Sequence, residues 1–79
     1  MKLYLINEVL YDYTAGMVAI AAENLEQCRN IFEEQFAMSS DSKGRLNEFD
    51  AAVENGYCQE LEVKSDTQPG VVTYVYGGG

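Results

Sequence analysis

Residues 2–36, KLYLINEVLYDYTAGMVAIAAENLEQCRNIFEEQF, decide the fold of this chain of 79 residues. Apolar and aromatic residues occupy both parities of residues 2–13, which is typical of a central or well-covered strand. The segment Thr14-Ala15-Gly16 predicts a turn in which Gly16 adopts a positive φ, and residues 17–22 predict a second short strand. Because the connection is so short, the two strands are expected to form an antiparallel hairpin.

A helix is predicted directly after the hairpin. Asn24 is a favourable N-cap, and Gln27 stands three residues later, as in a capping box. A run of apolar residues at helical spacing then predicts the buried side of this helix: Leu25, Cys28, Phe32 and Phe36. The opposite side is rich in glutamate and is expected to face solvent.

The second half of the chain predicts one more helix and two more strands. Residues 39–44 indicate a polar loop, and a shorter helix is expected from near Asn47 to the stop at Gly56. Residues 57–63 and 71–76 indicate strands. The resulting order, ββααββ, predicts an α+β fold with a mostly antiparallel four-stranded sheet and both helices packed on one face. The length is that of a single domain, 1–79.

The charge of the chain limits the class of partner. Thirteen acidic residues stand against five basic ones, which gives a net charge of −8. Such a surface repels nucleic acid and anionic membranes and attracts basic protein surfaces, of which nucleic-acid-binding grooves are the commonest kind. The acidity also suits a merely solubilising surface, and the sequence leaves both interpretations open.

Catalytic chemistry finds little support in the residue types. There is no histidine, no glycine-rich phosphate loop and no serine-centred elbow, so a non-enzymatic protein without metal or cofactor is expected. Cys28 and Cys58 are interpreted as buried, reduced thiols. No apolar run approaches the length of a membrane span, and a cytoplasmic location is expected.

The candidate partner-binding residues are carboxylates on the two predicted helices and two tyrosines of the last strand. The carboxylates are Glu26, Glu33, Glu34, Glu48, Asp50 and Glu54. Tyr74 and Tyr76 share one face of the last strand and predict an aromatic patch on an open sheet face, joined by Tyr4 if the strands are neighbours. Such a patch would anchor the edge of a partner contact, cover the sheet edge, or mediate a homodimer.

The chain ends in glycines, which allows another interpretation. Gly78 and Gly79 after a strand resemble the tail of ubiquitin-like sulfur carriers. In that family the flexible diglycine enters the site of an adenylating enzyme and its carboxylate becomes the reactive group. The plainer expectation for a glycine-rich terminus is fraying.

The first 36 residues resemble a further group of proteins. The segments YLINE at 4–8, YTAG at 13–16, VAIAA at 18–22 and LEQC at 25–28 are similar in arrangement to the small phage and mobile-element proteins that include type I anti-CRISPR inhibitors. The resemblance implies an inhibitor that binds a CRISPR surveillance complex in the bacterial host cell and blocks target DNA without doing chemistry. It transfers no functional residue, so the candidate residues rest on charge and exposure.

Overall fold

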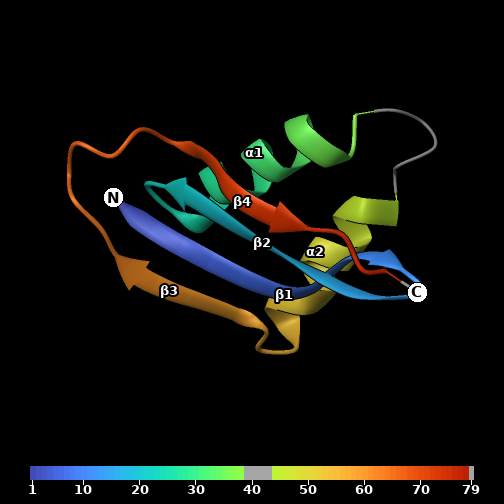
Figure 1. Ribbon diagram of the computed structural model, residues 1–79. Helices are drawn as coiled ribbons and strands as arrows, with labels where there is room; N and C mark the ends of the chain where they lie inside the picture. Colours follow the sequence, from blue (N-terminus) through green and yellow to red (C-terminus); the bar gives the residue numbers. More distant parts are fainter. Residues whose placement is uncertain (39–43, 79) are drawn as a thin grey trace.

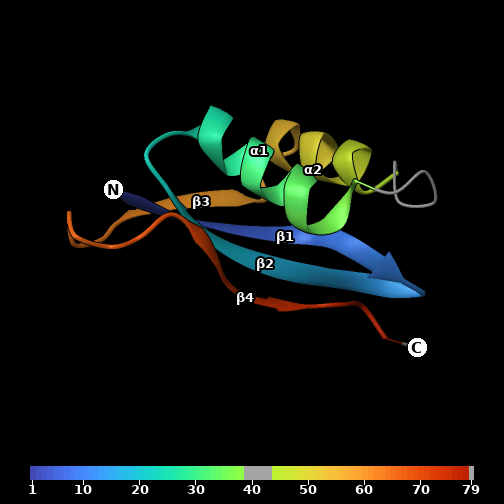
Figure 2. The ribbon, with the colours of Figure 1, turned by 90° about the horizontal axis from the view of Figure 1, so that it is seen from above.

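The computed structural model describes residues 1–38 and 44–78. Its elements are β1 (Lys2–Asp12), β2 (Thr14–Ala22), α1 (Leu25–Phe36), α2 (Gly44–Glu54), β3 (Cys58–Glu62) and β4 (Gly70–Val75). The strands form one antiparallel sheet in the order β3-β1-β2-β4 (Figure 1), and both helices lie on the same side of it (Figure 2). The predicted α+β fold is therefore confirmed. Most of the predicted loop, residues 39–43, lies outside the described residues.

The core lies between the helices and one face of the sheet. Phe32 of α1 and Phe49 of α2 meet there with ring centroids 5.0 Å apart. They pack on alternate residues of the two central strands, among them Tyr4, Ile6, Val18 and Ile20. Three members of the predicted α1 stripe are buried, whereas Leu25 is 38% exposed because it stands in the first turn, at the margin of this layer. Neither helix is long and apolar enough to cross a membrane.

Local signals set one end of each helix. The Asn24 side chain accepts a hydrogen bond from the Gln27 amide at 2.8 Å, so the predicted N-cap is confirmed. The Gln27 side chain accepts a hydrogen bond at 2.6 Å from the amide of Glu23, the residue before the cap, and not from the Asn24 amide as in a standard capping box. At the end of α2, the amides of Gly56 and Tyr57 donate to the carbonyls of Val53 and Ala52. With Gly56 at φ 85°, this is a Schellman motif, and the predicted stop is confirmed.

The hairpin turn predicted at residues 14–16 is wrong, and β2 begins three residues before the predicted start. Asp12 pairs with Thr14, so the chain reverses at Tyr13, which has φ 69°, and β2 already begins at Thr14. The cause is the register of the two strands, because the pairs from Lys2↔Ala22 to Asn7↔Met17 centre the hairpin on residue 12. The two bulges in β1 each add one residue to that strand and move the reversal only as far as Tyr13.

Gly16 serves a close backbone contact instead of a turn. It is not among the residues with positive φ, and a Cβ placed on it would overlap the carbonyl oxygen of Val75. The residues after β4 run along the hairpin. The Gly77 amide donates a hydrogen bond to Leu10 O and the Gly78 amide donates one to Thr14 Oγ1, both at 3.0 Å. The expectation of a frayed terminus is therefore wrong as far as Gly78.

Cys28 is expected to react slowly with thiol reagents in the folded protein. The side chain is fully buried, and this burial raises its pKa to about 12. At pH 8 the thiolate, which is the reactive form, is then scarce. In a Cys58→Ser variant, we expect Ellman's reagent to label Cys28 at least about 100-fold more slowly in buffer than in urea. Equal rates in the two solvents would contradict this burial.

Candidate partner-binding groove

A groove with an apolar floor and a charged rim runs between the two helices. Its lining residues are Leu25, Glu26 and Arg29 of α1 and Phe49, Asp50, Val53 and Glu54 of α2. The floor is formed by the apolar members of this set, and the charged members stand along its sides. Three of the carboxylates expected from the sequence, Glu26, Asp50 and Glu54, are thus brought together from two helices.

An ion pair joins the helices at the groove. Arg29 Nε and Nη2 donate to the two carboxylate oxygens of Asp50 at 2.8 and 2.9 Å. The hydrogen bonds from Arg29 lower the pKa of Asp50, and the hydrogen bond to Asp50 raises the pKa of Arg29. This geometry is the bidentate form that sets the guanidinium plane and the carboxylate in a fixed relation. Asp50 is therefore engaged within the chain.

The remaining carboxylates leave the groove negative. Three carboxylates against one guanidinium amount to two negative charges in excess. Among residues 1–38 and 44–78, no ion pair involves Glu26 or Glu54. Glu33 lies near enough to Arg29 to raise its pKa through charge, while Glu34 is exposed farther around α1.

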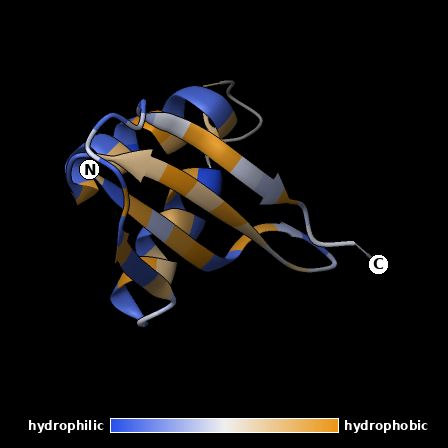
Figure 3. Cartoon of the chain, turned by 60° about the vertical axis from the view of Figure 1, so that its left-hand side comes forward, coloured by the Kyte–Doolittle hydropathy of each residue, from blue (hydrophilic) through white to orange (hydrophobic). Residues whose placement is uncertain are grey.

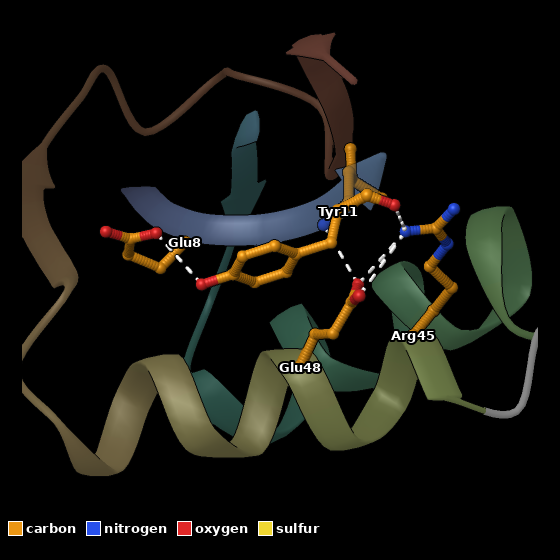
Figure 4. Close-up of polar contacts among 5 residues, drawn as sticks. Glu8, Tyr11, Arg45 and Glu48 are labelled. Atoms are coloured by element: carbon orange, nitrogen blue, oxygen red, sulfur yellow. Dashed lines mark hydrogen bonds and ion pairs between the residues drawn. The ribbon is translucent and has the colours of Figure 1, made fainter. Parts of the chain in front are cut away.

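Glu48 lies on the other side of α2 and has a structural role there. Its Oε1 atom accepts a hydrogen bond from the Leu10 amide at 3.0 Å and one from Arg45 Nη1 at 3.2 Å (Figure 4). The same Arg45 nitrogen donates to the carbonyl oxygen of Tyr11 at 2.8 Å. The Tyr11 hydroxyl in turn donates to Glu8 at 2.9 Å. The bonds of Glu48 and Arg45 link α2 to the bulged end of β1, where Glu8 and Leu10 have positive φ.

Tyr74 and Tyr76 do not lie on an open sheet face. Their rings stand 5.2 and 6.2 Å from that of Phe36, the last residue of α1, and Arg45 lies 5.4 Å from the Tyr76 centroid. The pairing of Tyr74 with Val18 turns it toward the helices. Tyr4 points to the same side but is buried beneath them. The predicted open aromatic patch is therefore wrong, and these half-exposed tyrosines lie by the end of α1, away from the groove.

The apolar floor of the groove and its arginine were not predicted from the sequence. A signal was present, because an apolar residue precedes an acidic one at Leu25-Glu26, Phe49-Asp50 and Val53-Glu54. Such pairs place a carboxylate beside the apolar stripe of a helix. Which apolar stripes face each other, however, depends on how the helices pack on the sheet.

Comparison of the chain with protein-family models, curated proteins and solved structures finds no match.

Proposed function

We propose that this chain is a non-enzymatic inhibitor that binds a basic, nucleic-acid-binding protein surface through the groove between α1 and α2. The observation that carries the proposal is the joining of an apolar floor, formed by Leu25, Phe49 and Val53, to a rim with two excess negative charges. The apolar floor favours a partner that buries an apolar side chain in the groove. The negative rim favours a partner with positive charges next to that side chain.

The fitting partner presents an apolar side chain flanked by lysines or arginines. Glu26 and Glu54 are available to such cations, since neither is in an ion pair within the described residues. Basic surfaces that hold nucleic acid space their cations for phosphates, and a carboxylate array takes the place of those phosphates. Binding of this kind weakens as the salt concentration rises.

The resemblance of the first 36 residues supplies the most specific target class. It implies a type I CRISPR surveillance complex, in which the occupied surface would be the one that receives target DNA. The net charge of −8 agrees with this role, because an acidic protein competes with DNA for the same cations. The proposed mechanism is occlusion and requires neither metal nor cofactor.

Reversing the two free rim charges is expected to weaken partner binding. For Glu26→Lys/Glu54→Lys we expect about a tenfold higher Kd for the surveillance complex at physiological salt. Each substitution replaces an exposed ion pair between a groove carboxylate and a cation of the partner with a repulsion between two cations. The control is Glu62→Lys/Asp66→Lys, which makes the same change in net charge at exposed positions of β3 and the β3–β4 connection. Titration of a purified complex by calorimetry, with circular dichroism to verify folding, measures the effect.

The outcomes separate a site from a general charge effect. Equal loss in both double variants would mean that only net charge matters, and an unchanged Kd in the groove variant would rule out the groove. A third variant, Glu33→Lys/Glu34→Lys, extends the test along α1. A loss there larger than at the groove would move the contact to the outer side of this helix.

The carrier alternative agrees less well with the geometry. A sulfur carrier needs a free, extended terminus, whereas the amides of Gly77 and Gly78 are hydrogen-bonded to the hairpin. Deleting Gly78 and Gly79 is the direct comparison, because it would abolish carrier function and leave binding through the helix groove intact.

A further inference from the structure

A second cavity lies on the other side of α2 from the groove. Its volume is about 300 Å³, at the lower end of the range for small-molecule sites. The bulged end of β1, the helix α2 and the residue before β3 line it together, and none of its lining residues lines the groove. We call it the Tyr11 pocket, after one of its principal lining residues, which are Glu8, Tyr11, Asn47, Glu48, Ala51 and Tyr57.

The ring of Tyr11 forms one wall of this pocket and is held at both ends. Its hydroxyl donates to Glu8 at 2.9 Å, and its carbonyl oxygen accepts from Arg45 at 2.8 Å. Figure 4 shows the ring lying over α2, with Glu8 at its hydroxyl end and Glu48 at the other end. The hydrogen bond to Glu8 raises the pKa of Tyr11, and the nearby Glu48 and Tyr57 add to this rise through charge. The aromatic wall is thus formed before any ligand binds.

The bulges of β1 bring Glu8 and Tyr11 to the same pocket. In a regular strand, residues three positions apart point to opposite faces. Here, register shifts on either side of Val9 each add one residue to β1, and Glu8 and Leu10 adopt a positive φ. Bulges re-aim side chains in this way and are common beside functional sites. They join a carboxylate and a ring that regular pairing would separate.

The pocket is negative. Its carboxylates are those of Glu8 and Glu48, and among residues 1–38 and 44–78 no lysine or arginine lines it. Glu48 is paired with Arg45, whereas Glu8 makes no ion pair in the part of the chain that the structure describes. The central strands are built from hydrophobic segments (Figure 3), and Glu8 stands in β1 between Ile6 and Val9, which are both buried. A carboxylate in these surroundings favours a cationic ligand.

The chemistry of the lining suits an ammonium group on an alkyl chain. Aromatic rings such as those of Tyr11 and Tyr57 attract cations, the Asn47 side chain offers an amide oxygen, and Ala51 offers an apolar contact. A guanidinium prefers both oxygens of one carboxylate. One oxygen of Glu8 already accepts a hydrogen bond from Tyr11, so this pair is partly occupied, whereas an ammonium needs only single acceptors.

A metal ion fits the lining less well. Among the described residues, no group of three or more histidine, cysteine, aspartate or glutamate side chains could hold one. We propose that the Tyr11 pocket binds a primary alkylammonium group. Glu8 supplies the counter-charge, the two tyrosine rings contact the ammonium and the adjoining methylene, and Ala51 contacts the rest of the chain. A lysine side chain of another protein or a free amine carries this group.

Titration of the isotope-labelled full chain with n-butylammonium chloride, followed by NMR at constant ionic strength, tests the proposal. At about pH 7 the amine is fully charged. We expect saturable shifts centred on the amides of Tyr11, Ala51 and Tyr57, with a Kd on the order of 1–10 mM. The neutral n-butanol has the same chain length and is expected not to saturate up to about 100 mM. This comparison uses the unmodified chain and needs no variant to fold.

Two further probes distinguish the sources of the ammonium group. They are a lysine blocked at both its backbone ends and the free diamine putrescine. Saturable binding of either one supports the proposal. A Kd at least about threefold lower for the blocked lysine would indicate a protein partner, and one at least about threefold lower for putrescine would indicate a free amine.

Matched variants test the two recognition elements. Glu8→Gln keeps an acceptor for the Tyr11 hydroxyl but loses the charge, so about a fivefold higher Kd for n-butylammonium is expected. Asp12→Asn loses the same charge at an exposed position of β1 outside the pocket and is expected to leave the Kd unchanged. Tyr57→Leu removes a ring and is expected to raise the Kd about threefold. Tyr13→Leu, at a ring that is 93% exposed and outside the pocket, is expected to leave it unchanged.

Any of three results would overturn the proposal. They are the lack of saturable shifts at the pocket amides up to about 100 mM n-butylammonium, equal affinity for n-butanol, and equal loss of affinity in folded Glu8→Gln and Asp12→Asn. Circular dichroism verifies that each variant is folded. The groove variant Glu26→Lys/Glu54→Lys changes the other side of α2 and is expected to keep its affinity for n-butylammonium. Failure of the groove proposal and failure of this one are therefore distinguishable.

Discussion

Replacing Gly16 with alanine is expected to lower the free energy of unfolding by about 3 kcal/mol. The added Cβ would overlap the carbonyl oxygen of Val75 and would lie 2.8 Å from the Gly77 amide nitrogen. Both are backbone atoms that cannot rotate away, so the end of β4 must move off β2 to relieve the overlap. A glycine-to-alanine change without such an overlap is commonly stabilising, because it restricts the unfolded chain. A lower free energy of unfolding would therefore indicate the overlap, and a higher one would indicate that the overlap is absent.

The C-terminal glycines provide a matched pair for the same experiment. A Cβ on Gly77 would overlap Thr14 O, whereas nothing lies within 4 Å of a Cβ on Gly78. Gly77→Ala is expected to cost about 2 kcal/mol, and Gly78→Ala to change stability by less than about 0.5 kcal/mol. Urea denaturation followed by circular dichroism measures all three variants. If Gly16→Ala and Gly77→Ala were as stable as Gly78→Ala, the C-terminal segment would not pack against the hairpin.

Glu48→Ala is expected to lower the free energy of unfolding by about 2–3 kcal/mol. The carboxylate accepts a hydrogen bond from the amide of Leu10, a residue with no exposed surface, and it also pairs with Arg45. A hydrogen bond to a charged group contributes about 1.5–3 kcal/mol, and its removal leaves the buried amide without a partner. Glu48→Gln keeps an acceptor oxygen but loses the charge, so about half of this cost is expected.

Glu54→Ala is the control on the same helix. Glu54 is exposed and makes no ion pair within the described residues, so its removal should change stability by less than about 0.5 kcal/mol. Urea denaturation measures the free energy of unfolding of the three variants. Hydrogen exchange at the Leu10 amide reports on its hydrogen bond to Glu48. Equal stability of the Glu48 and Glu54 variants would show that the bulged end of β1 does not depend on this carboxylate.

Features with short-range causes were predictable from the sequence. The start of α1 depends on Asn24 and Gln27, which lie three residues apart, and the stop of α2 depends on Gly56. The order of elements followed from the period of the apolar residues, and β1 is a central strand as expected. Of the candidate carboxylates, the structure brings together Glu26, Asp50 and Glu54, each of which follows an apolar residue. Glu33 follows Phe32 in the same way but does not line the groove, so this sequence pattern alone did not identify the set.

Features with long-range causes were not predictable in this way. The first turn of α2 begins at Gly44, three residues before the predicted start, and Arg45 in that turn is held by Tyr11 O, Glu48 and the Tyr76 ring. The side to which Tyr74 points depends on its register with β2, which is set across more than fifty residues of chain. A shift of one residue would have turned it to the open face.

By itself, the sequence determined the kind and order of the elements, the start of α1, the stop of α2 and the excess of negative charge, because each of these depends on residue type or on spacing within a few positions. The tertiary structure determined the reversal at Tyr13, the engagement of Glu48 and Asp50 within the chain and the groove between the helices. Each of these depends on strand register, on the bulges of β1 or on which helix faces meet. Contacts between distant segments set those relations, and local propensity does not encode them.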